Sequence, residues 1–92
     1  MKPAEKEYRL NYWYTEGVRL FKMWKQDNDE VTWKAFCCCV AVMCEYDRNV
    51  KDKRTQQLNS TAWKYGWLKG EKTLEEWQES GCFDENFFNQ NT

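Results

Sequence analysis

The chain has 92 residues, a formal net charge of −1 and no histidine. A chain of this length forms a single domain with a thin core. Without histidine it lacks the commonest general base and the commonest metal ligand. Four glycines and one proline are too few for the many turns of a β-sandwich or barrel. The composition therefore predicts one all-α domain over residues 1–92, without a catalytic centre, a metal or a cofactor.

The apolar segments of the sequence do not suggest a membrane protein. The longest nearly apolar run covers residues 35–44, about half of the ~20 residues that a membrane-spanning helix needs. The first residues are charged, and no apolar stretch of the kind that a signal peptide needs follows them. We therefore expect a cytoplasmic protein that does not bind membranes, placed in the host cytoplasm if it is viral.

Five cysteines are present, and four of them lie within residues 37–44. An odd number without a CxxC pair does not fit a disulfide scaffold, which spaces an even set through loops. Thiols inside an apolar stretch more often act as small buried hydrophobes, so we predict free, buried cysteines. Cys82 follows Ser80 and Gly81 in an expected loop, which makes it the one candidate for an accessible, reactive thiol.

The first two elements are predicted from the spacing of apolar residues. Between Leu10 and Trp24 these recur at intervals of three and four, which predicts a helix over residues 5–26. Gly17 lies on this stripe and costs about 1 kcal/mol of helix propensity, so we expect another helix to approach closely there. Residues 30–46 are apolar nearly all round, which predicts a buried helix. A β-strand is the alternative for this segment, but its length favours the helix.

The next two elements are predicted over residues 51–69 and 73–80. Gly70 suits the position after the first of these helices, because glycine readily adopts the left-handed conformation that is common there. Thr73 with Glu76 forms a capping box, which marks the start of the second helix. With the two earlier helices they complete a small bundle of three to four helices, followed by a tail over residues 82–92.

Aromatic side chains exceed what one apolar stripe on each helix can bury. Two tryptophans lie one turn apart on a second face of the 51–69 helix, where another part of the chain or a partner must cover them. Trp and Tyr dominate binding hot spots. We therefore predict a non-enzymatic protein-binding module, whose partner is a larger host protein or complex, or a second copy of the chain. The residues concerned are Trp63, Trp67, Phe87 and Phe88, with Tyr8 and Tyr12 as further aromatics off the main stripe.

The chain resembles, in general style, the accessory proteins of phages and mobile elements that bind and inhibit a host enzyme. Small size, the absence of histidine, helical patterning and a high aromatic content carry this likeness. It rests on no motif. It implies a viral or phage inhibitor that acts by direct contact with a host protein.

The alternative function is that of a small nucleic-acid-binding regulator. Residues 48–72 contain seven basic and two acidic residues, a charge of +5, whereas residues 73–92 contain five acidic and no basic residues. Basic groups neutralise phosphates, amides read base edges and tryptophans stack on bases. An isoelectric point near 5.5 argues against this reading, because DNA-binding domains usually lie above about 9. The candidate contacts are Arg48, Lys51, Lys53, Arg54, Gln57 and Lys64.

Overall fold

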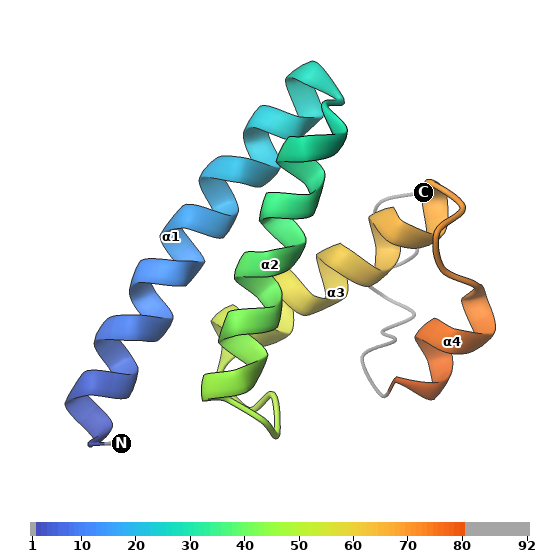
Figure 1. The fold of residues 1–92 in the computed structure, drawn as a ribbon. Coiled ribbons are helices and arrows are strands. Elements are labelled where there is room, and N and C mark those ends of the chain that lie inside the picture. The colour runs from blue at the N-terminus through green and yellow to red at the C-terminus, as the bar shows by residue number, and fades with distance from the viewer. Residues whose placement is uncertain (1, 81–92) are drawn as a thin grey trace. The chain divides into compact units, whose positions relative to one another are not determined.

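The computed structural model describes residues 2–80, which form four α-helices (Figure 1). They are α1 (Pro3–Asp27), α2 (Glu30–Tyr46), α3 (Lys53–Leu68) and α4 (Leu74–Glu79). The described part contains no strand, so the predicted all-α class is confirmed. Within these residues, no helix combines the length and the apolar character needed to cross a bilayer.

The chain divides into two compact units, one ending at Leu58 and the next beginning at Asn59. The first unit contains α1, α2 and the first turns of α3. The second contains the rest of α3 and α4. The two units are described separately.

In the first unit, α1 and α2 pack side by side as an antiparallel hairpin (Figure 1). Asn28 ends α1 in the left-handed conformation, with φ of 53°, and donates its backbone N–H to the Trp24 carbonyl at 2.7 Å. Asp29 then caps α2 by accepting from the Val31 amide at 2.9 Å. The core between the helices is aromatic: the ring centroids of Trp24 and Trp33 are 4.7 Å apart. Such rings bury large areas, which compensates for the small number of core residues.

Gly17 allows the closest approach in this unit. A Cβ atom at this position would lie 2.7 Å from Cδ1 of Leu58 and 3.6 Å from Cβ of Cys39. Both neighbouring residues are buried, so a methyl group would displace packed side chains. The close approach predicted from the glycine on the apolar stripe is therefore confirmed, and it involves the start of α3 as well as α2.

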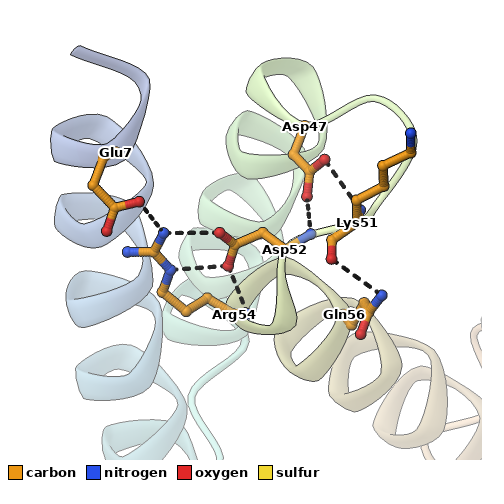
Figure 2. Close-up of polar contacts among 6 residues, drawn as sticks. All are labelled: Glu7, Asp47, Lys51, Asp52, Arg54 and Gln56. Carbon is orange, nitrogen blue, oxygen red and sulfur yellow. Dashed lines mark hydrogen bonds and ion pairs between the residues drawn. The ribbon is translucent and has the colours of Figure 1, made fainter. Parts of the chain in front are cut away.

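The turn between α2 and α3 is held by the buried carboxylate of Asp47, which is 4% exposed. Its two oxygens accept from the backbone amides of Lys51 at 3.1 Å and Asp52 at 2.9 Å (Figure 2). Burial alone would raise the pKa of Asp47, but these hydrogen bonds outweigh it and hold the pKa below its ordinary value of 3.8. The same turn places Val50 in the left-handed region, with φ of 50°.

The guanidinium of Arg54 connects the start of α3 to α1, and the carboxylate of Asp52 holds it in place. Asp52 accepts from the backbone amide and the Nε of Arg54, both at 2.9 Å, and pairs with its Nη2 at 2.8 Å. The same Nη2 donates to Glu7 of α1 at 2.7 Å (Figure 2). Because it accepts these hydrogen bonds from Arg54, the pKa of Asp52 falls to about 2.

The second unit turns sharply after α3. Gly70 has φ of 82°, as its predicted place after the helix requires, and donates its N–H to the Trp67 carbonyl at 3.0 Å. Thr73 Oγ1 accepts from the Glu76 amide at 3.0 Å, which confirms one half of the predicted capping box. Trp77 of α4 is fully buried.

Candidate protein-binding surface

The two tryptophans predicted as binding residues pack within their own unit. Trp63 and Trp67 are both half-buried. The Lys72 ammonium lies 4.6 Å from the ring centroid of Trp63, and the Trp77 ring lies 6.3 Å from that of Trp67. Of the two coverings considered for these indoles, the structure shows the one supplied by the chain itself. The other predicted binding residues, Phe87 and Phe88, lie outside the described residues.

The residues proposed for nucleic-acid contact fall into two groups. Arg48, Lys51 and Lys53 are exposed, although Arg48 lies 3.8 Å from the carboxylate of Glu45. Gln57 is also exposed, and its Oε1 accepts from the Tyr14 hydroxyl at 3.0 Å.

Of the remaining two candidates, Lys64 is wrong as a phosphate contact, whereas Arg54 is partly exposed and already ion-paired. Lys64 is 0% exposed, and its ammonium lies inside the fold, 5.9 Å from the Tyr65 ring centroid. Arg54 is committed to Asp52 and Glu7. The charge pattern predicts both residues as solvated cations, but Lys64 has no exposed surface, and Arg54 would have to give up its ion pairs to bind a phosphate.

The cysteines are less buried than predicted. Cys37, Cys38, Cys39 and Cys44 are all free thiols, but only Cys39 is buried, whereas Cys38 is exposed. Burial raises the pKa of the Cys39 thiol. The prediction of uniformly buried cysteines in this segment is wrong, because α2 turns one of its faces to solvent. Cys82 lies outside the described residues. Within residues 2–80, no group of three or more potential metal-ligating side chains comes together.

The exposed aromatic side chains in the described part of the chain lie on α1. Tyr8 is 73% exposed and Tyr12 is 54% exposed, and the two are one helical turn apart. The buried residues of α1 include Leu10 and Trp24, which project from the opposite side of the helix. We call the exposed side the α1 outer face. It consists of Glu5, Tyr8, Arg9, Tyr12, Thr15, Glu16 and Arg19.

The surface around the two tyrosines is uneven. One open hollow is lined by Tyr8 and Tyr12 together with Asn11, Thr15 and Glu16. A second is lined by the same tyrosines together with Glu5, Arg9 and Trp13. The tyrosines therefore form a ridge between two hollows. A protein surface of complementary shape can pack against this ridge.

Charged pairs flank this ridge. Arg9 pairs with Glu5 at 3.1 Å and also donates to the Tyr46 hydroxyl at 2.9 Å. Arg19 pairs with Glu16, and this hydrogen-bonded pairing lowers the pKa of Glu16. Exposed pairs of this kind contribute only about 0.2–1 kcal/mol to stability, so the side chains can exchange partners when another surface docks.

No protein-family model matches this sequence, and comparisons with curated proteins and with solved structures find no match. The sequence identifies Tyr8 and Tyr12 as aromatics off the apolar stripe, but the predicted binding residues do not include them. Their spacing of four residues, on the side opposite Leu10 and Trp24, was the signal that could have placed them there.

Proposed function

We propose that this chain is a non-enzymatic protein-binding module that docks through the α1 outer face. The observation that carries the proposal is the pair of exposed tyrosines, Tyr8 and Tyr12, on a helix whose other side is packed. Tyrosine and arginine are enriched among the residues that dominate binding energy. The face presents two tyrosines and two arginines within about four helical turns.

The rigidity of α1 also supports this proposal. The hairpin with α2 and the contact between Glu7 and Arg54 fix the helix within its unit, so little conformational freedom is lost when a partner binds. Preorganisation of this kind improves affinity without any new contact. The small, histidine-free and aromatic-rich composition suggests one form of this function, the inhibition of a host protein by a phage accessory protein.

The test compares partner capture by three proteins: the wild type, the double variant Tyr8→Ala with Tyr12→Ala, and Val31→Ala. Val31 is 74% exposed on α2, so its variant is a matched control for the loss of exposed apolar surface. Alanine is the best helix former, so the helical circular-dichroism signal should be retained in all three. Capture from a lysate of the natural host is run with and without nuclease, and each captured protein is then purified.

We expect a purified partner to bind the wild type and Val31→Ala equally in calorimetry, and to bind the tyrosine double variant at least about 30-fold more weakly. That factor corresponds to a hot-spot loss of about 2 kcal/mol. Equal affinity for the double variant would refute the assignment to the α1 outer face. A set of captured proteins that disappears with nuclease would instead favour a nucleic-acid contact through Arg48, Lys51 and Lys53.

A further inference from the structure

We propose that the partner of the α1 outer face is the same face of a second copy of this chain, packed antiparallel about a two-fold axis beside Tyr12. This inference rests on the proposed protein-binding function and names its partner. The choice of a second copy as partner is inferred from the order of charges along α1.

Residues seven apart lie on the same side of a helix, because seven residues make about two turns. Glu5, Tyr12 and Arg19 form one such row along the α1 outer face. The tyrosine is in the middle, and a charge of opposite sign lies about 10.5 Å along the axis to either side, at 1.5 Å per residue. Reversing this row about Tyr12 therefore places Glu5 opposite Arg19 of the second copy.

A second row gives the same result. Arg9 and Glu16 are also seven apart, on one flank of the tyrosine ridge. They lie about 4.5 Å and 6 Å from Tyr12 along the helix axis. Reversal places Arg9 opposite Glu16 of the second copy with an offset of about 1.5 Å, which flexible side chains can span. These four side chains are 32–55% exposed. Each can turn toward a second helix, Arg9 by giving up its hydrogen bond to the Tyr46 hydroxyl.

The parallel arrangement is disfavoured for the same reason. In a parallel dimer each charged residue would face the same residue of the second copy, Glu5 against Glu5 and Arg9 against Arg9. These like charges repel each other. In the antiparallel arrangement, Tyr8 of one copy faces the stretch from Thr15 to Glu16 of the other, where one of the open hollows lies. The ridge of one copy thus meets a hollow of the other.

The expected dimer is weak. The contacting stretch from Glu5 to Arg19 is about 21 Å long, so one such helix pair buries less than the ~1,200 Å² of a standard stable interface. We therefore expect a dissociation constant on the order of 100 µM, the range of transient complexes.

The first experiment is sedimentation equilibrium from about 10 µM to 1 mM protein with a reductant present, so that the thiols do not cross-link. We expect the wild type and Val31→Ala to shift from monomer to dimer across this range, which follows from the expected dissociation constant. The double variant Tyr8→Ala with Tyr12→Ala should stay monomeric. A monomeric wild type at 1 mM, or a double variant that still dimerises equally, would overturn the proposal.

The second experiment tests the orientation through a charge swap that combines Glu5→Arg, Arg9→Glu, Glu16→Arg and Arg19→Glu. The swap preserves both ion pairs within the helix, and a homodimer of it keeps all of the cross-copy pairs. In the antiparallel arrangement a mixed dimer of swapped and wild-type chains faces like charges. Its affinity, measured by fluorescence anisotropy, should therefore be at least about 10-fold weaker than that of either homodimer.

A parallel dimer predicts the reverse, because its mixed form would be the complementary one. Mixed association as tight as that of the homodimers, or tighter, would therefore overturn the antiparallel assignment. The swap removes the hydrogen bond from Arg9 to Tyr46, so its fold is checked by circular dichroism. If the swap unfolds, the tyrosine variants still test whether the α1 outer face forms the dimer, and a swap limited to Glu16→Arg with Arg19→Glu tests the orientation without changing Arg9. A chain that is monomeric but loses a captured partner with the tyrosines would overturn this inference and leave the proposed function standing.

Discussion

Gly17→Ala should destabilise the protein, although alanine is the better helix former. The propensity of α1 gains about 1 kcal/mol from the substitution. Against this, the new methyl group would lie 2.7 Å from Cδ1 of Leu58, and forcing extra volume into a packed core costs about 1–3 kcal/mol. Leu58 is only 4% exposed and has little room to move. We therefore expect a net loss of about 1 kcal/mol, the difference of the two effects.

The sign should invert when Leu58 is removed. Leu58→Ala alone should cost about 2–5 kcal/mol, because it deletes buried methyl groups and leaves a cavity. In that background the methyl group of Gly17→Ala enters vacated space, so only the helix-propensity gain of about 1 kcal/mol remains. The two substitutions should therefore couple by about 2 kcal/mol, within the range found for residues in contact.

Urea unfolding of the four proteins in this cycle, followed by circular dichroism at 222 nm, measures both effects. A change in the midpoint without a change in slope reports stability alone. If Gly17→Ala stabilised the protein equally in both backgrounds, the glycine would be present for a reason other than close packing against Leu58, and the reasoning would be refuted.

Three further outcomes are expected. Asp52→Asn should cost about 1–2 kcal/mol at pH 7, allowing for partial solvent screening. The pKa of this carboxyl is lowered from 3.8 to about 2. The ionised carboxylate therefore stabilises the fold fully above about pH 4, and this stabilisation is lost as the pH falls through 2. The urea midpoints of the variant and the wild type should converge at that low pH. Val50→Gly should increase the free energy of unfolding by about 0.5–1 kcal/mol, because the left-handed φ of 50° strains a β-branched residue and suits glycine. The thermal midpoint should therefore rise, and a lower midpoint would contradict this. Thr73→Ala removes the acceptor of the Glu76 amide and should cost about 1 kcal/mol locally, seen as roughly fivefold faster hydrogen exchange at that amide; unchanged exchange would show that the cap contributes nothing.

The candidate site was only partly predictable. The sequence showed that the chain has more aromatic residues than its helix stripes can bury, and this surplus led to the protein-binding prediction. It pointed to Trp63 and Trp67, which pack within their own unit, whereas Tyr8 and Tyr12 are the aromatics that stand exposed. Helical spacing alone does not distinguish a covered aromatic from an exposed one when both lie off the apolar stripe. The residues that cover a side chain can be distant in sequence.

The sequence by itself determined the helices, since their signals are local. Apolar spacing, the capping residues Asp29 and Thr73, and Gly70 at a chain reversal all act within a few residues, and every observed helix end lies within two residues of its prediction.

Only the tertiary structure decided which charges are internal and which surfaces are open. Arg54 meets Glu7 across 47 positions of sequence, and Lys64 is enclosed, although the charge pattern alone counted both as solvated. Burial depends on contacts between residues far apart in the chain, and the spacing within one helix does not record those contacts.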